Sequence, residues 1–204
     1  MMRLRLGRAL MAGALFGGAA VPAVAADLPA PALPIFAAPV AAPVASPYGI
    51  LSEARFGLLA HGVYEHEFGS VDVNGEVLTV KPYHLNGAWD YLIPRFHLGG
   101  NLNTAGGTSD VYGGVTWQFP IYRRFFGELT FGGDANDGNT HRVITNTTDI
   151  RVGCTVMFRE SASLGYHLDD HWNVMAIAEH ASNAGYCSHN EGITAIGARV
   201  GYVF

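Results

Sequence analysis

Hydrophobic and polar residues alternate along most of the chain after about residue 51, with the period of two that a β-strand produces. Eight segments show this alternation and are predicted as strands, at residues 53–65, 72–80, 94–104, 109–120, 124–134, 153–167, 172–183 and 192–204. An even number of strands of about ten residues is what an antiparallel barrel needs to cross an outer membrane. The pattern therefore predicts an all-β fold, an eight-stranded antiparallel outer-membrane β-barrel over residues 51–204.

The last predicted strand shows its two faces most clearly. Even positions from Thr194 to Phe204 are mostly apolar or aromatic, whereas odd positions carry small residues and Arg199. We expect the even face to meet lipid and the odd face to line a narrow interior, where small residues leave room for Arg199. A soluble barrel with its apolar faces turned inward would have the same period and is the alternative.

The first 50 residues lack this alternation. Three arginines precede an apolar stretch over residues 9–21, and an Ala-Val-Ala sequence ends at Ala25. This order predicts a signal peptide over residues 1–25 that is cleaved before Ala26. Residues 26–50 are rich in alanine and proline, and because proline lacks the N–H that a helix or sheet needs, we expect a periplasmic linker.

The strand count also predicts an orientation. With the N-terminus in the periplasm, the connections near residues 66–71, 105–108, 135–152 and 184–191 lie at the cell surface. The formal net charge is −5, and removing three arginines makes it about −8. The sequence lacks the clustered basic residues that bind nucleic acid, and its histidines show no tight metal-ligand spacing. We therefore expect no binding of nucleic acid, no metal site and no cofactor.

Candidate chemistry lies at the end of the seventh predicted strand, in the sequence Glu179-His180-Ala181-Ser182-Asn183. Residues two apart share a strand face, so His180 and Ser182 lie side by side on the outward face. A neutral imidazole can act as the base that makes a serine nucleophilic, and the amide of Asn183 could donate to an oxyanion. By itself, a His-x-Ser pair is a common surface arrangement and only a weak indication of catalysis.

Several segments, in order along the chain, resemble the PagL lipid A 3-O-deacylase family. They are Asn101-Leu102-Asn103-Thr104-Ala105-Gly106, Gly114-Val115-Thr116-Trp117-Gln118-Phe119-Pro120, Phe158-Arg159-Glu160-Ser161, His180-Ala181-Ser182-Asn183, and Asn190-Glu191-Gly192 running into Gly197-Ala198-Arg199-Val200-Gly201-Tyr202. The resemblance implies an outer-membrane hydrolase that removes the 3-O-linked acyl chain from lipid A of lipopolysaccharide in the outer leaflet of a Gram-negative bacterium. It also implies that Ser182 is the nucleophile, His180 the base and Asn183 the oxyanion donor.

The chain departs from that family at Thr194, where the resemblance implies a glutamate that orients the histidine. Another carboxylate could replace it, the enzyme could work as a dyad, or activity could be lost. If strands six and seven pair through a tight turn near residues 168–171, Glu160 falls opposite Ala178 or His180. Because a carboxylate that faces lipid is costly, Glu160 is the first candidate for the acid. Glu191, in the neighbouring surface loop, is the second.

Cys154 and Cys187 are the only cysteines. The same register brings Cys154 near residues 184–186, and the periplasm and cell surface permit disulfides. We therefore expect either a disulfide that ties the loop 184–191 to strand six, or two free thiols.

Two functions of different classes remain open at this stage. The first is the serine hydrolase acting on lipid A, and the second is a non-catalytic structural or adhesive outer-membrane barrel, which the threonine at position 194 favours. Expected partners are lipid A or lipopolysaccharide and the membrane itself. The sequence leaves open a homodimer.

Overall fold

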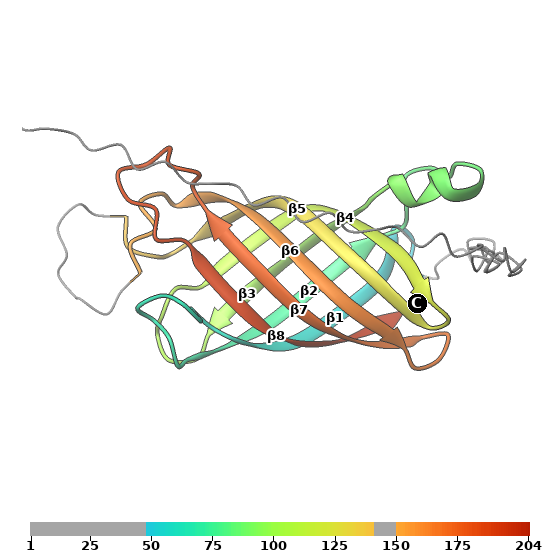
Figure 1. Cartoon of the computed structure of the whole chain (residues 1–204), viewed down its shortest axis with the longest axis horizontal. Helices are drawn as coiled ribbons and strands as arrows, with labels where there is room; N and C mark the ends of the chain where they lie inside the picture. Colours follow the sequence, from blue (N-terminus) through green and yellow to red (C-terminus); the bar gives the residue numbers. More distant parts are fainter. Residues whose placement is uncertain (1–47, 141–149) are drawn as a thin grey trace, which may run out of the picture. The chain divides into compact units, whose positions relative to one another are not determined.

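A computed structural model describes residues 48–140 and 150–204, which form a closed barrel of eight antiparallel strands (Figure 1). The strands are β1 (Leu51–Ala60), β2 (Val71–Thr79), β3 (Arg95–Asn103), β4 (Asp110–Tyr122), β5 (Phe125–Asn136), β6 (Val156–His167), β7 (Trp172–Ser182) and β8 (Ile193–Val203). Each strand pairs with its sequence neighbours, and β1 closes the barrel against β8. The predicted fold is confirmed, whereas the predicted signal peptide and most of the linker lie outside the described residues.

Most strand bounds agree with the prediction to within a few residues, but β1 ends at Ala60 instead of residue 65. Gly62 has a φ of +56°, a left-handed conformation that glycine adopts at little cost, and it turns the chain out of the strand. The amide of Glu65 then donates to the carbonyl of Gly62 at 3.0 Å, which closes a turn. Residues 61–65 therefore belong to a surface loop.

The connection between β2 and β3 contains a short 3₁₀-helix, η1 (Gly87–Leu92), which the alternation did not predict. No helix in the described ranges is long and apolar enough to cross a membrane.

The side chains on the two faces of the barrel wall point as predicted for an outer-membrane barrel. Along β7 and β8 the odd positions are buried or half-buried and the even positions are half-buried or exposed, as expected. Large apolar side chains such as Phe56, Leu98 and Leu129 are more than half exposed on the outer surface. Because the apolar face points outward and the polar face inward, the soluble alternative is wrong.

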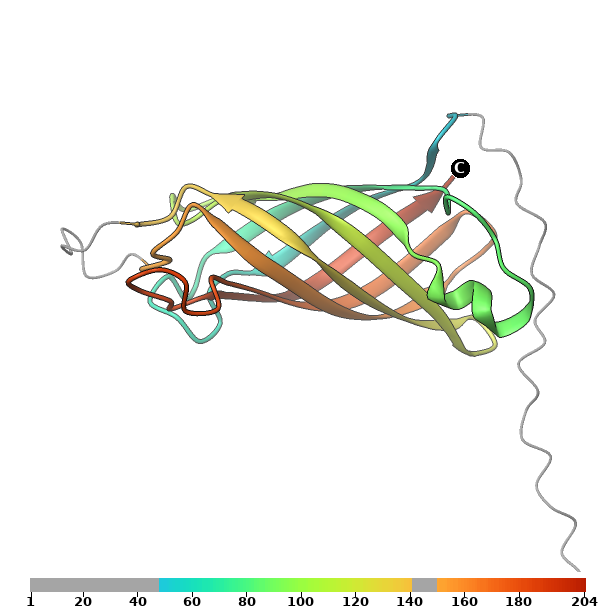
Figure 2. The ribbon, with the colours of Figure 1, turned by 90° about the horizontal axis from the view of Figure 1, so that it is seen from above.

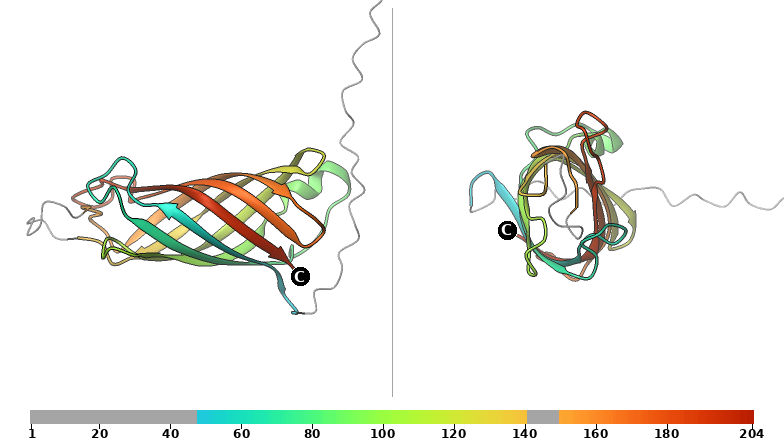
Figure 3. Two further views of the ribbon diagram at one scale, coloured as in Figure 1. Left: turned by 90° about the horizontal axis from the view of Figure 1, so that it is seen from below. Right: turned by 90° about the vertical axis from the view of Figure 1, so that its left-hand side faces the viewer.

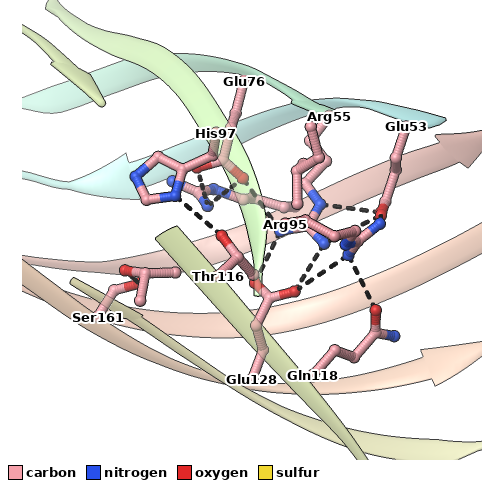
Figure 4. A network of polar contacts seen from close by, with 12 residues as sticks. Glu53, Arg55, Glu76, Arg95, His97, Thr116, Gln118, Glu128 and Ser161 are labelled. Carbon is pink, nitrogen blue, oxygen red and sulfur yellow. Dashed lines mark hydrogen bonds and ion pairs between the residues drawn. The ribbon is translucent and has the colours of Figure 1, made fainter. Parts of the chain in front are cut away.

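Charged and polar side chains fill the interior (Figure 4). The Arg55 guanidinium contacts carboxylates of Glu53, Glu76 and Glu128 at 2.7–3.1 Å, and all four side chains are buried. Buried charges require such partners, because removing one would leave the other uncompensated. Glycine makes room for this packing, since a Cβ at Gly57 would lie 2.6 Å from the Arg199 side chain. The interior is therefore a packed polar core.

The two ends of the barrel differ (Figures 1 and 2). At one end lie η1, the tight turns after β4 and β6, and the C-terminus. The other, which we call the loop end, carries the connecting residues 61–70, 104–109, 137–140, 150–155 and 183–192. Seen from the loop end, these segments lie around the barrel mouth (Figure 3, right). The predicted catalytic residues at the end of β7 lie at this end of the barrel.

Candidate functional site

His180 and Ser182 lie on the outward face of β7 at the loop end, where Ser182 is the last strand residue. Both side chains are half-buried, while Glu179 and Ala181 on the other face are buried in the interior. The side chains of His180 and Ser182 form no hydrogen bond with each other among the described contacts. Catalytic hydrogen bonds are often long before substrate binds, so this separation is compatible with a nucleophile and its base.

Strand register determines what flanks the pair. His180 lies opposite Glu160 on β6 and opposite Thr194 on β8, and Ser182 lies opposite Phe158. Phe158 contacts Phe131 and Tyr186, with ring centroids 6.3 and 6.1 Å away, respectively. The serine is therefore bordered by an aromatic cluster on its β6 side, and the histidine lies between a carboxylate and a hydroxyl.

The imidazole of His180 bonds to the hydroxyl on β8. Its Nδ1 lies 3.0 Å from the Thr194 hydroxyl, whose Oγ1 donates to Glu65 Oε1 at 2.8 Å. A carboxylate accepts only, so the single hydroxyl proton is used on Glu65 and the ring must donate its Nδ1–H to Thr194. In the neutral ring this tautomer leaves Nε2 without a proton, as a general base requires.

Close packing against the ring fixes its place. Gly192, the residue directly before β8, has a φ of +70°, and a Cβ there would lie 2.8 Å from His180 Cε1 and 3.3 Å from Nε2. Any other residue would be strained at this φ and would push the imidazole aside. The ring is thus held by the Thr194 hydroxyl and by the glycine backbone.

The predicted contact between Glu160 and His180 is not formed. The register is as predicted, with Glu160 directly opposite His180, and the glutamate is exposed on the outer surface. Within the described part of the chain, however, Glu160 makes no hydrogen bond or ion pair. Side chains stand roughly perpendicular to a sheet, so opposite positions alone do not bring two polar atoms into contact. The ring instead turns its Nδ1 toward β8.

The second predicted acid, Glu191, binds Arg151. Its carboxylate accepts from the Arg151 backbone amide at 2.9 Å and from Nε at 2.7 Å, and lies 3.5 Å from His66 Nδ1. Partial burial works against ionisation, but these donors outweigh it and hold the pKa of Glu191 below its ordinary value. Glu191 therefore joins two surface loops and does not contact His180.

Asn183 is buried and its donors are all engaged. The side-chain amide donates to the carbonyls of Val152 and His189, and the backbone N–H donates to Asn190 Oδ1 at 2.8 Å. Its amide oxygen accepts from the Gly185 N–H at 2.9 Å. An oxyanion role stays a prediction, and in this geometry it requires one amide hydrogen to leave its carbonyl acceptor.

Further links hold the loops over the strand ends. Cys154 and Cys187 form a disulfide with a Cα–Cα distance of 5.9 Å, which confirms the bonded alternative. Glu67 accepts from the backbone amides of Thr108 and Ile150 at 2.6 and 3.0 Å, so one carboxylate joins three loops. Glu67 also lies 2.9 Å from Nε2 of His61, a buried ring beyond the end of β1.

An apolar hollow of about 610 Å³ lies on the same outward face, farther from the loop end. Its lining includes Phe56, Leu58, Leu164, Val174, Ala176 and Ala198. Ala176 and Ala198 are paired across β7 and β8, and their small side chains form its floor. Ala176 is four residues from His180, about 13 Å along the strand, and the paired Ala162 and Ala178 lie between.

The family model for lipid A 3-O-deacylase (PagL) matches residues 64–203. The crystal structure of the outer membrane enzyme PagL has a TM-score of 0.57 at 16% identity, over 74% of this chain and 98% of that chain. The N-terminal β-barrel domain of Pseudomonas aeruginosa OprF has a TM-score of 0.49 at 12% identity, over 76% and 97%. No curated protein sequence matches the chain.

Glu65 is the residue of this site that the sequence reasoning missed. The alternation extended the first strand to residue 65, which placed Glu65 inside a strand and away from Thr194. The signal that could have found it is Gly62, together with the closure of the barrel. A turn at Gly62 and pairing of β1 with β8 bring the loop after β1 to the start of β8.

Proposed function

Because the chain belongs to the lipid A 3-O-deacylase (PagL) family, we propose that Ser182 and His180 carry out its reaction at the lipid-facing surface of the barrel. The protein is an outer-membrane hydrolase of a Gram-negative bacterium that removes the 3-O-linked acyl chain from lipid A. The observation that carries the proposal is the pair of hydrogen bonds from His180 Nδ1 to Thr194 Oγ1 at 3.0 Å and from Thr194 Oγ1 to Glu65 Oε1 at 2.8 Å. These bonds assign the proton of the neutral ring to Nδ1, so Nε2 is left to accept a proton from Ser182, two residues along the same face of β7.

The reaction follows from this arrangement. As Ser182 Oγ attacks the ester carbonyl, its proton passes to His180 Nε2 and a tetrahedral intermediate forms. The imidazolium then gives the proton to the leaving 3-oxygen of the sugar, which leaves the acyl chain on Ser182. Water activated by His180 hydrolyses this acyl-enzyme and releases a free fatty acid. No cofactor is needed for these steps.

The position of the site fits a substrate that stays in the membrane. With the loop end at the cell surface, the pair lies at the height of the outer leaflet, where lipid A resides. From His180, Ala178 and Ala176 follow on the same face of β7 and lead to the apolar hollow. We place the acyl chain of the substrate in this hollow. Each buried CH₂ of that chain contributes about 0.8 kcal/mol, so the hollow favours binding of the chain that is cut. A homodimer is not required, since both residues come from one chain.

The test is a mass-spectrometric assay of the purified barrel with lipopolysaccharide in detergent. Wild-type protein should convert lipid A to a species that lacks one 3-O-linked acyl chain, with release of the free 3-hydroxy fatty acid. Ser182→Ala, which loses only the hydroxyl, should reduce this conversion by at least about 10³-fold. Heat-modifiable gel mobility serves as the control for folding. A folded Ser182→Ala barrel that still deacylates would contradict the proposal.

A further inference from the structure

We propose that Glu65 is the acid of this site and that it acts on His180 through the hydroxyl of Thr194, an inference that rests on the proposed function. The predicted strand register did not point to Glu65. Its role follows from two hydrogen bonds in series, 3.0 Å from His180 Nδ1 to Thr194 Oγ1 and 2.8 Å from there to Glu65 Oε1. Glu65 and Thr194 are positioning residues, because the ring alone exchanges a proton with Ser182.

The series can do what a directly bonded acid does. When Ser182 gives up its proton, His180 becomes a cation, and an opposite charge within about 4–6 Å favours that charged form. The two bonds keep the Glu65 carboxylate inside this range. The hydroxyl of Thr194 is polarised by the carboxylate to which it donates, so its oxygen becomes a stronger acceptor for the ring N–H. The same bonds hold the imidazole in the tautomer that catalysis needs.

The loop over residues 61–70 is built to present this carboxylate. The Val63 amide donates to the Thr194 carbonyl at 3.0 Å, which fixes the loop to the start of β8. Glu65 Oε2 accepts from the Tyr64 amide at 3.1 Å, so both carboxylate oxygens are bonded. Two residues on, Glu67 binds the neighbouring loops at Thr108 and Ile150. Glu65 thus faces the site while Glu67 anchors the loop from its other side.

Competing carboxylates are less suitable in the described part of the chain. Glu160 is exposed and makes no hydrogen bond or ion pair there, although it lies opposite His180. Glu191 has its charge balanced by Arg151 in the next loop. Glu65 is therefore the acid that the hydrogen bonds connect to the base.

The experiment measures kcat and KM for lipopolysaccharide deacylation by four variants. Glu65→Gln removes the charge but keeps the shape, and Thr194→Val removes the hydroxyl but keeps the shape. Each variant should lower kcat by about 10–100-fold and leave KM within about threefold of the wild type. This loss in kcat is smaller than the roughly 10⁴-fold loss found when a directly bonded acid is neutralised. The double variant should be no worse than either single variant, because the residues act as a unit. Thr194→Ser keeps the hydroxyl and should retain most of kcat.

A rescue variant tests whether the Glu65 carboxylate acts on His180 through its charge or only by holding the structure of the loop. Adding Thr194→Glu to the Glu65→Gln variant brings a carboxylate directly beside His180 and should restore kcat at least tenfold. His66→Gln, an exposed change in the same loop, is the matched control and should leave kcat within about twofold. Unchanged kcat in Glu65→Gln, failure of the rescue, or a larger loss in Glu160→Gln would each overturn the proposal.

Ser182→Ala in the same series separates this inference from the function on which it rests. If Ser182→Ala is inactive while Glu65→Gln keeps its full kcat, only the role of Glu65 fails. If folded Ser182→Ala remains active, the proposed nucleophile itself is wrong, and the role of Glu65 fails with it.

Discussion

In the proposed pair of His180 and Ser182, the imidazole is held on two sides. Its Nδ1 bonds to Thr194, and the backbone of Gly192 packs against its other edge. A surface histidine beside a small polar residue would have neither constraint. The sequence predicted the pair and its face, because the alternation along β7 fixes which residues share a side. It could not predict how the ring turns between β6 and β8, since side-chain rotamers depend on contacts that span the barrel.

The two residues should behave as a unit in kinetics. We expect Ser182→Ala and His180→Ala each to lower kcat by several orders of magnitude, and the double variant to be little worse than either, since neither group works without the other. Deacylation rates of the three folded variants, measured under single-turnover conditions, check this. Losses that add up in the double variant would show that the two side chains act independently.

At the scale of elements, the loop end is held by a few bonds that cross between loops. Register between β6 and β7 was predictable, and with it the nearness of Cys154 and Cys187, because tight antiparallel turns leave few alternatives. The loop after β1 was not, because a single left-handed glycine ended the strand five residues early. That one boundary concealed Glu65.

The buried His61 and its two carboxylate partners, Asp72 and Glu67, predict that the stability of the barrel depends on pH. Burial of the ring works against its charged form, but hydrogen bonds to Asp72 and Glu67 at 2.7 and 2.9 Å outweigh this and raise the pKa of His61 to about 9. Because this pKa is above the ordinary value, the contribution is complete below about pH 6.5 and is lost as the pH rises through about 9. We expect a loss of up to about 3 kcal/mol in the free energy of unfolding over that window.

Urea unfolding of the detergent-solubilised barrel at pH 6, 8 and 10 measures this loss. His61→Gln keeps a hydrogen-bonding side chain but cannot ionise, and its stability should change less between pH 6 and pH 10. If the free energy of unfolding changed equally with pH in the wild type and in the variant, groups other than His61 would set the pH dependence.

For the whole molecule, the barrel separates two kinds of surface. The interior is a network of ion pairs such as those of Arg55 (Figure 4), and the exterior is an apolar belt interrupted at the loop end by the proposed catalytic pair. Periodicity predicted both faces and the eight strands. It did not predict which interior charges pair, because some partners, such as Glu128 on β5 for Arg55 on β1, come from strands that are not neighbours in the barrel. The proposed site on the exterior would let a lipid substrate react without leaving its leaflet.

We propose above all that His180 activates Ser182 as a nucleophile on the lipid-facing surface. The most direct test of this proposal is covalent labelling of the folded barrel in detergent with a fluorophosphonate, followed by peptide mass spectrometry. The account predicts one adduct, on Ser182, formed at least about 100-fold more slowly in His180→Ala. An adduct on another residue, or equally fast labelling of Ser182 without the histidine, would contradict it.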